Sequence, residues 1–524
     1  MGYFVNPGTR KFEMSLNSEI YVDKSELIKE TNALFDTTRR FICLSRPRRF
    51  GKTMAAEMLA AYYGSEQNSH DLFKDLKIAQ HASYEKYLNQ ANVIMVNIQE
   101  FLSQTKTIDE LLTFLQTSIT DELIEAYPDF SFKNTSNLIQ IMRDVHSQSK
   151  KPFVVLIDEW DCLFREFKDD LEAQKIYLDF LRLWLKDQAF VGLAYMTGIL
   201  PIKKYGTHSA LNMFKEYAMT NPGRFLDYFG FRDDEVENLC AQYDLDFSEM
   251  RNWYNGYFIE RGKPMYNPKS VVSALEDGLF DSYWNKTETF EALRDYIMLD
   301  FDGLRDKVTL LLAGERISVE DEAFSNDMTT FSSAEDVLML LVHLGYLAHD
   351  FPTETVRIPN EEVKKEFVKS MRSLKWNNVI HAIKDSRKLI QAIWNFDGET
   401  VAAGIAKVHE ENTSILTYND ENSLSCVLSL ALYGAKDYYT IIRELPTGKG
   451  FSDLVFLPRT KHLDKPALVV ELKWDKTVES AIDQVKKKNY VSALDEYEGN
   501  LLLVGVNYNK ADKSHTCHIE SFEK

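Results

Sequence analysis

The chain has 524 residues and a formal net charge of −19 at pH 7, with 44% of its residues hydrophobic. This length predicts roughly three or four domains, and the apolar fraction is typical of folded globular proteins. The negative charge excludes a protein that coats nucleic acid through bulk positive charge, so any contact with DNA would depend on local basic patches.

The cysteines and the hydrophobic pattern indicate the cellular compartment in which the protein works. The five cysteines include no C-x-x-C pair, which favours a reducing cytoplasm and argues against structural zinc. The N-terminus has no basic segment followed by an apolar one, and no apolar stretch is long enough to span a bilayer. We therefore expect a cytoplasmic protein with no membrane partner.

A motif for binding phosphate lies near the N-terminus. Residues 41–44 form an apolar run that predicts a short buried strand, and Gly51-Lys52-Thr53 opens a helical segment, 54–63. Strand, loop, Gly-Lys-Thr and helix is the arrangement of a P-loop. Backbone N–H groups of such a loop hold phosphate oxygens, the lysine reaches the β- and γ-phosphates, and the threonine hydroxyl binds Mg²⁺. We therefore expect ATP and Mg²⁺ as cofactors.

The loop of this motif departs from the usual pattern at one position. Arg46 stands where the first glycine of G-x-x-x-x-G-K-[ST] would fall. The loop is also basic, and its arginines are expected to serve the nucleotide rather than DNA. We therefore count Arg48, Arg49 and Phe50, with Gly51, among the predicted nucleotide-binding residues.

A pair of acids follows a second apolar strand farther along the chain. Residues 153–157 predict a buried strand, which ends at Asp158 and Glu159. A carboxylate at such a strand end can hold the water shell of Mg²⁺, and its neighbour can orient the attacking water. The alternative is that a basic turn and an acidic helix cap occur in one chain by chance. We favour the nucleotide site, with Asp158 near the metal and Glu159 as the catalytic residue.

Strands and helices alternate around these motifs. Apolar strands are predicted at 93–98 and 191–196, with helical periodicity at 108–127 and 138–146. This alternation predicts a parallel sheet covered by helices, in which ligands bind at the carboxyl ends of the strands. Thr197 follows the strand 191–196, where its hydroxyl would either sense the γ-phosphate or belong to a strand-end turn.

The pattern of predicted helices and strands changes from residue 290. Short helical stretches are followed by a helix at 334–341, a strand-like segment at 355–358 and another helix at 361–371. Helices followed by a small hairpin suggest a winged-helix-like connector. Such a connector could bind DNA or act as a rigid spacer, and the acidic surroundings favour the spacer. We expect three domains, at 1–289, 290–395 and 396–524.

The C-terminal region carries a second cluster of charged residues. Strands are predicted at 451–457 and 466–474, with Asp453 on the first and both Glu471 and Lys473 on the second. Residues two apart on a strand project from the same face, and Asp453 on the neighbouring strand can meet them. Burying two carboxylates and an ammonium would be costly without a purpose. The acids can bind Mg²⁺ through oxygen, and the lysine can neutralise the transition state or position the attacking water.

These motifs together resemble known families. The N-terminal portion is similar to the bacterial and archaeal predicted AAA-ATPase family, in which arginine is usual at the position of Arg46. The C-terminal portion is similar to the PD-(D/E)XK nuclease domain fused to these ATPases. Ser452 stands where the superfamily name refers to proline, and Glu421 where the superfamily often has an acid on its first helix. The matching segments are Val22-Asp23-Lys24, Arg46-Pro-Arg-Arg-Phe-Gly-Lys-Thr53, Leu156-Ile-Asp-Glu159, Trp253-Tyr-Asn-Gly-Tyr257, Tyr266-Asn-Pro268, Gly345-Tyr-Leu347, Ile358-Pro-Asn360, Gly448-Lys-Gly450, Asp453, Glu471-Leu-Lys473 and 484–490.

The resemblance implies an α/β fold: a P-loop NTPase with a parallel sheet, a helical winged-helix-like connector and a C-terminal α/β nuclease-like domain. It also implies an ATPase and a Mg²⁺-dependent DNA nuclease whose phosphodiester hydrolysis is gated by the nucleotide cycle. In that function Glu421, Asp453 and Glu471 would bind metal and Lys473 would assist hydrolysis. The alternative is a nucleotide-dependent switch or defence-type regulator, whose nuclease-like domain binds a partner or nucleic acid without cutting. The expected partners are therefore DNA, a protein partner or a second copy of the chain.

Overall fold

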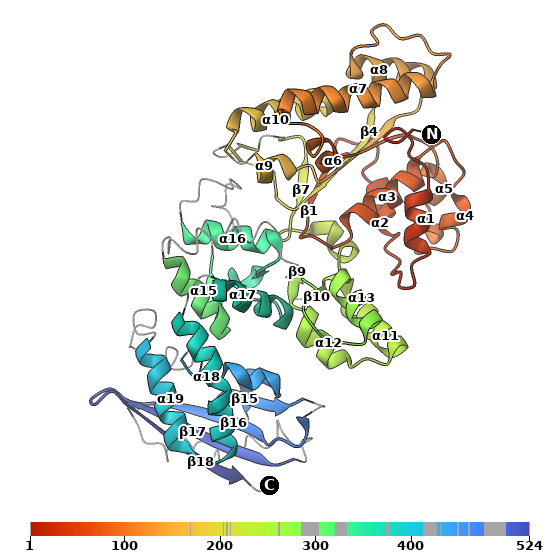
Figure 1. Ribbon diagram of the computed structural model, residues 1–524. Helices are drawn as coiled ribbons and strands as arrows, with labels where there is room; N and C mark the ends of the chain where they lie inside the picture. Colours follow the sequence, from red (N-terminus) through yellow and green to blue (C-terminus); the bar gives the residue numbers. More distant parts are fainter. Residues whose placement is uncertain are drawn as a thin grey trace. The chain divides into compact units, whose positions relative to one another are not determined.

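The chain folds into two compact units (Figure 1). The first comprises Met1–Tyr296 and Ser318–Val363, and the second Ile297–Ile317 and Lys364–Lys524. The predicted division into three domains stays a prediction; of its connector, residues 318–363 lie in the first unit and 364–395 in the second. This computed structural model describes all residues except 1, 168, 203, 206–207, 210, 260–262, 285–302, 320–332, 374–376, 412–426, 430, 448–449, 460–461, 476–498 and 523–524.

The first unit is built on a five-stranded sheet with the order β2-β3-β4-β1-β7. All neighbouring pairs in this sheet are parallel, which confirms the predicted parallel sheet. β7 was not predicted, because its three residues include one buried side chain and are too few for a periodic signal. The strands are β1 (Phe41–Ser45), β2 (Asn92–Asn97), β3 (Phe153–Asp158), β4 (Val191–Gly198) and β7 (Lys215–Tyr217).

Helices cover this sheet on both faces (Figure 1). Alternate residues of β1 and β3, among them Ile42, Leu44 and Leu156, share one buried core with Phe12, Met58 and other side chains of the N-terminal helices. That face is covered by α1 (Arg10–Leu16), α2 (Leu27–Asn32), α3 (Lys52–Tyr63), α4 (His70–Phe73), η1 (Lys77–Gln80) and α5 (Tyr84–Tyr87). The other face carries α6 (Ile98–Leu102), α7 (Ile108–Ala126), α8 (Leu138–Ser149), α9 (Cys162–Glu166) and α10 (Leu171–Leu185).

The rest of the first unit begins with a small antiparallel sheet and its helices. β8 and β9 each pair with β10, and Asn267 caps α13 by accepting hydrogen bonds from the N–H groups of Lys269 (3.0 Å) and Ser270 (3.4 Å). Asn267 is therefore a helix N-cap, and Pro268 begins the helix. The elements are β5 (Lys204–Tyr205), β6 (His208–Ser209), η2 (Gly223–Tyr228), β8 (Phe231–Arg232), α11 (Asp233–Tyr243), α12 (Phe247–Tyr254), β9 (Tyr257–Ile259), β10 (Lys263–Tyr266) and α13 (Pro268–Asp277).

A helix and a hairpin complete the first unit, as expected of the winged-helix-like segment. α16 (Ala334–Leu344) ends at Gly345, whose φ of +83° suits glycine. β12 (Ala348–Asp350) and β13 (Thr355–Arg357) then pair antiparallel, with η6 (Phe351–Thr353) between them. α17 (Glu361–Ser373) follows and crosses the boundary into the sequence of the second unit. A two-residue strand, β11 (Ile317–Ser318), precedes this segment.

The second unit contains a mixed sheet with the order β14-β15-β16-β17-β18. Only β16 and β17 run parallel among these pairs. A buried core joins one face of the sheet to residues of the helices α18 and α19 (Figure 1). The elements are α15 (Leu304–Ala313), α18 (Asn377–Trp394), α19 (Gly398–Glu411), η7 (Tyr433–Asp437), β14 (Tyr439–Thr447), β15 (Gly450–Pro458), β16 (Ala467–Trp474), β17 (Leu501–Asn509) and β18 (Ser514–Phe522).

The sequence predicts a strand at 501–506, which β17 confirms, but it predicts this strand as the last one, which is wrong because β18 follows β17. β18 pairs antiparallel along the whole length of β17 but lies at the edge of the sheet, and only Ile519 in it is fully buried. An edge strand with mostly polar residues produces no apolar run, so its sequence does not reveal it. Among the described residues, no helix combines the length and the apolar character needed to cross a bilayer.

A histidine pair in the second unit, with His409 buried and His515 half-buried, makes the stability of this unit depend on pH. His409 Nδ1 lies 2.9 Å from His515 Nε2, and burial lowers the pKa of each ring to about 4. Because these pKa values are depressed, the unfolded chain takes up protons first, and stability is lost as pH falls from about 6.5 toward 4. We expect the urea midpoint to fall over this range, and His409→Gln with His515→Gln to flatten the dependence. An unchanged slope in the double variant would contradict this account.

Candidate functional site

The N-terminus of α3 forms a cradle of backbone donors. Gly51 precedes the helix with a φ of +86°, and a Cβ there would meet nothing within 4 Å, so conformation rather than space calls for glycine. The N–H of Ala55 donates to Gly51 O (3.0 Å), as the first bond of the helix. The N–H groups of residues 52–54 therefore have no partner inside the helix. These donors and the helix dipole suit an anion.

Lys52 is buried beside this cradle. Its Nζ donates to the backbone oxygens of Arg46 (3.0 Å) and Pro47 (3.1 Å). Burial lowers the pKa of the Lys52 ammonium, and the nearby Glu159 and Asp158 carboxylates oppose this shift. Neutral carbonyls are weaker partners for an ammonium than phosphate oxygens are. The lysine is therefore placed to exchange them for a phosphate.

The predicted metal-binding residues meet at the carboxyl end of the sheet. Thr53 Oγ1 donates to Asp158 Oδ2 (2.6 Å), and the Thr197 hydroxyl donates to Asp158 Oδ1. Asp158 and Thr197 are fully buried. The structure thus brings together residues from α3, β3 and β4 that the sequence predicts to act together. A hydroxyl and a carboxylate are hard oxygen donors, so this set fits Mg²⁺. Thr197 orients Asp158 here, and its contact with a γ-phosphate stays a prediction.

Glu159 has a strained backbone conformation and pairs with a cation, Arg165, that the sequence did not predict. Its φ is +51°, and its Oε2 lies 2.6 Å from Nη2 of Arg165 on α9. Arg165 Nε also lies 3.6 Å from Oδ2 of Asp161. Asp161 accepts the N–H groups of Ile199 (3.1 Å) and Leu200 (2.8 Å), and burial raises its pKa. A non-glycine residue held at positive φ beside an ion pair is typical of a functional position.

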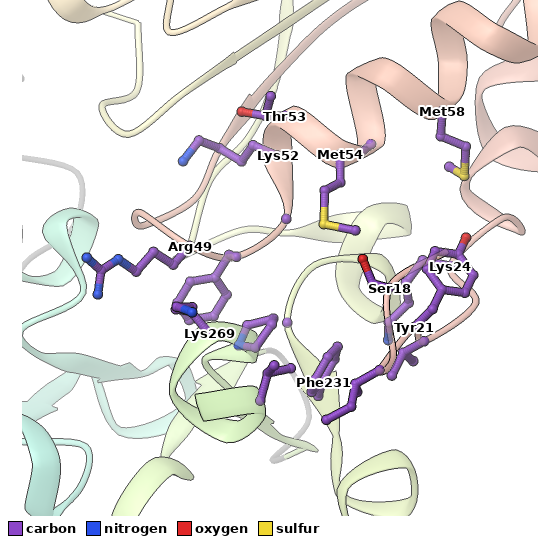
Figure 2. Close-up of a pocket in the computed structure, with 18 of the residues that line it drawn as sticks. Ser18, Tyr21, Lys24, Arg49, Lys52, Thr53, Met54, Met58, Phe231 and Lys269 are labelled. Carbon is purple, nitrogen blue, oxygen red and sulfur yellow. The ribbon is translucent and has the colours of Figure 1, made fainter. Parts of the chain in front are cut away.

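A pocket of about 690 Å³ opens from the phosphate loop. Lys52, Thr53 and Glu159 line one end of it. At the other end the wall includes apolar and aromatic side chains from the N-terminal segment, from β8 and from α13. Figure 2 shows Lys52 and Thr53 apart from Tyr21 and Phe231, with Met54 between the two groups. A phosphate-binding end, and a wall that combines aromatic and apolar side chains with charged ones such as Glu19 and Lys24, suit a phosphorylated aromatic ligand such as a nucleotide.

A buried ion pair fixes the wall that contains Tyr21. Lys24 Nζ contacts both carboxylate oxygens of Glu235 (2.7 and 2.9 Å) and Asp227 O (3.0 Å). Burial lowers the pKa of Lys24, which Glu235 opposes. Asp23 accepts the N–H groups of Ser25 and Lys77, each at 2.8 Å. This tether has no local signature in the sequence, because Lys24 and Glu235 are 211 residues apart.

The basic residues of the loop have three different surroundings. Arg48 lines the pocket and makes no hydrogen bond or ion pair with another described residue. Arg49 Nη1 donates to Tyr283 O (2.7 Å), and its side chain extends away from Lys52 and Thr53 in Figure 2. The Phe50 ring packs edge-on against Tyr257, with centroids 5.2 Å apart. Arg48, Arg49, Phe50 and Gly51 all line the pocket, together with Lys269, which the sequence did not reveal.

Arg46, at the position of the missing glycine, is turned into the protein core. Its Nη1 donates to Ser45 O (2.7 Å) and Tyr217 O (2.8 Å), and its guanidinium lies 5.5 Å from the Phe229 ring centre. Burial lowers its pKa to about 10, so it stays charged at neutral pH. The side chain joins β1 to β7 and leaves the phosphate cradle open. The arginine therefore does not obstruct nucleotide binding.

The second predicted cluster is partly described. Lys473 Nζ lies 3.1 Å from Glu471 Oε1, and both side chains are buried, at 7% and 2% exposure. Val469 belongs to the core on the face opposite the helices, so by alternation Glu471 and Lys473 share that face. Glu421 and the side chain of Asp453 lie outside the described residues, although the β15–β16 register reaches Leu454 opposite Val470.

The predicted Mg²⁺ site of this cluster therefore stays a prediction. Among the described residues, no group of three or more His, Cys, Asp or Glu could hold a metal ion. Two of the three expected ligands, Glu421 and the side chain of Asp453, lie outside the described residues. What the structure does establish is a buried, paired carboxylate and ammonium on the strand predicted to carry them.

Comparison with known proteins confirms the resemblance for both portions of the chain. Residues 7–207 match the family model described as "Predicted AAA-ATPase", and residues 419–517 match that of the "PD-(D/E)XK nuclease superfamily". The first match contains the phosphate loop with Asp158, Glu159 and Thr197. The second contains Glu471 and Lys473.

Individual relatives are more distant. An "Uncharacterized protein in vnfD 5'region" of Azotobacter chroococcum mcd 1 is 26% identical over 366 residues, which are 66% of this chain and 64% of that protein. The chain thus spans less than two thirds of this relative. Cdc6p from Pyrobaculum aerophilum aligns at 11% identity and a TM-score of 0.27, over 70% of this chain and 97% of that one. The Aeropyrum pernix ORC2 protein, solved with ADPNP and ADP, aligns at 10% identity and a TM-score of 0.30. The alignment covers 68% of this chain and 96% of that one.

Proposed function

We propose that this chain, in which a predicted AAA-ATPase domain precedes a PD-(D/E)XK nuclease superfamily domain, hydrolyses ATP and cleaves DNA under the control of that nucleotide. The observation that carries the proposal is the hydrogen bond between Thr53 and Asp158, beside Lys52 and the free N–H groups of α3. Residues of α3, β3 and β4 would supply there the groups that a triphosphate and a divalent cation need.

The pocket accommodates both ends of ATP. The phosphates would accept hydrogen bonds from the N–H groups of residues 52–54 and from Lys52, with Arg48 and Lys269 as further cations of the wall. Thr53 and Asp158 would hold Mg²⁺, which when bound neutralises charge on the phosphate oxygens. The base would pack against the aromatic side chains of the wall, Tyr21 and Phe231.

Glu159 is the residue of this site that we assign to hydrolysis. Its carboxylate lines the pocket, and the ion pair with Arg165 fixes its direction. In the proposed reaction it orients the attacking water and accepts its proton. To hold a water, the Glu159 carboxylate must be fixed in position, and its ion pair with Arg165 fixes it.

Glu159→Gln should separate ATP binding from ATP turnover. Glutamine keeps an oxygen that can accept from Arg165 but loses the basic carboxylate, so we expect affinity near that of the wild type and turnover reduced by roughly 10²–10⁴-fold. Titration calorimetry and phosphate release measure the two quantities. Glu166→Gln, at an exposed neighbouring glutamate, is the matched control. Full turnover by Glu159→Gln would remove the assigned role.

The nuclease half of the proposal rests on the Glu471–Lys473 pair in the matching domain. Glu471, with the predicted ligands Asp453 and Glu421, would hold a Mg²⁺ ion that stabilises charge on the scissile phosphate. Lys473 would donate to a phosphate oxygen or hold the attacking water. Both side chains lie on one face of β16, which leaves them side by side for a single phosphodiester.

A cleavage assay on full-length protein tests the whole proposal. Single-stranded, double-stranded and branched DNA would be incubated with Mg²⁺, with and without ATP. The proposal predicts cleavage that requires Mg²⁺ and changes with ATP. ATP turnover without cleavage of any substrate would instead support the nucleotide-dependent switch, in which the nuclease-like domain only binds a partner.

A further inference from the structure

The side of the phosphate loop that faces away from the cradle contacts segments far along the chain. Arg49 has a φ of +71°, unusual for a residue other than glycine, and its Nη1 donates to Tyr283 O (2.7 Å). The N–H of the same Tyr283 donates to Oε1 of Glu362 (2.7 Å), in the first turn of α17. Glu362 is 1% exposed. One residue, Tyr283, therefore links the phosphate loop to the start of α17.

A second line of contacts runs from the loop to the end of α16. The Phe50 ring packs on Tyr257 at 88°, and Tyr257 OH donates to Gly345 O (2.9 Å). Pro47 also packs directly on this glycine, because a Cβ at Gly345 would lie 2.7 Å from Pro47 Cβ. These contacts join two residues of the loop, Pro47 and Phe50, to the helix cap that precedes the β12–β13 hairpin.

Residues 255–256, just before Tyr257, contact the end of the β12–β13 hairpin and the residues that follow it. Asn360 Nδ2 donates to Asn255 O (2.8 Å), and Arg357 Nη2 donates to Gly256 O (2.8 Å). Gly256 has a φ of +103°, and a Cβ there would lie 2.1 Å from Pro359 O. The motifs Trp253–Tyr257, Gly345–Leu347 and Ile358–Asn360, which the nucleotide site does not use, thus converge behind the loop.

We propose that these contacts form a relay through which nucleotide in the phosphate loop sets the state of the α16–hairpin–α17 segment. The proposal rests on the proposed ATP binding. Pro47, Arg49 and Phe50 carry the relay contacts, and the cradle N–H groups of residues 52–54 follow directly in the same loop, so a bound phosphate that prefers one loop conformation shifts the relay with it. α17 then continues past Val363 into the sequence of the second unit, which carries the nuclease domain.

Hydrogen exchange on the full-length protein tests the relay. Amide exchange is measured with and without a non-hydrolysable ATP analogue and Mg²⁺, at saturation established by calorimetry. We expect the analogue to slow exchange at residues 345–347 and 360–363 by at least about threefold, since a ligand shifts a conformational equilibrium by its differential affinity. Tyr257→Phe with Glu362→Ala removes the hydrogen bond to Gly345 O from one line and the acceptor of the Tyr283 N–H from the other, and should reduce this response while analogue affinity stays within about twofold.

Three further variants separate the relay from general destabilisation. Glu362→Gln keeps the acceptor for Tyr283 N–H and should restore the response that Glu362→Ala loses. Tyr127→Phe removes a comparable tyrosine bond, to Asn92 at 2.6 Å, outside the relay, and should respond like the wild type. Arg48→Gln should weaken affinity but keep the response at saturation.

The outcomes distinguish a failure of the relay from a failure of ATP binding. If the analogue binds and residues 345–363 exchange unchanged, or if the Tyr257→Phe, Glu362→Ala variant responds like the wild type, the relay is wrong and ATP binding stands. If calorimetry detects no binding of the analogue to the wild type, the proposed function fails and the relay fails with it.

Discussion

Lys473→Met is expected to abolish Mg²⁺-dependent DNA cleavage while ATP turnover persists. Lys473 is the ammonium of the buried pair with Glu471, so its loss removes the cation that would meet the developing charge on the phosphate. Removal of one such preorganised donor lowers turnover by roughly 10²–10³-fold. Initial rates of cleavage of labelled DNA, and phosphate release in the same samples, measure the two activities.

Stability controls are needed because this ammonium is buried. Leaving Glu471 without its cation destabilises the fold by about 3–5 kcal/mol, whereas replacing both partners is often near neutral. Glu471→Gln with Lys473→Met should therefore recover much of the urea midpoint lost by Lys473→Met but none of the cleavage. Lys510→Ala, at an exposed lysine of the same unit, should cleave like the wild type. Cleavage by the double variant would refute the assignment of this pair.

Lys52→Ala is expected to remove ATP binding and, with it, any effect of ATP on cleavage. Lys52 is fully enclosed beside the cradle, and charge-assisted hydrogen bonds contribute about 1.5–3 kcal/mol each. The loss of two such bonds to phosphate lowers affinity by a factor of about 10² or more. Titration calorimetry with ATP and Mg²⁺ measures the change directly.

The matched control for this variant is Lys74→Ala. Lys74 is an exposed lysine of the same unit, paired with Asp71 on α4, and should bind ATP like the wild type. A thermal melt of Lys52→Ala shows whether the loop carbonyls tolerate the loss of their donor. Wild-type affinity in a folded Lys52→Ala protein would mean that the pocket holds its ligand by other contacts.

Local chemistry in the sequence identified most of the candidate site. Gly51-Lys52-Thr53 between a strand and a helix, and acids at the end of a buried strand, follow from patterns within a few residues, and the parallel sheet brings the two together. The alternation of a strand likewise places Glu471 and Lys473 on one face without any knowledge of the fold. These features were predictable because backbone geometry alone determines them.

Tertiary structure decided what surrounds those residues. The Lys24–Glu235 tether, the partnership of Glu159 with Arg165, the inward turn of Arg46 and the relay from Arg49 through Tyr283 to Glu362 have no local signature. Arg49 and Tyr283 are 234 residues apart, and a single hydrogen bond between them leaves no periodic trace in either segment. The sequence determined which groups could bind phosphate and metal, because that chemistry is a property of the residues. The fold determined what those groups are connected to, because long-range contacts form only when distant segments pack into one core.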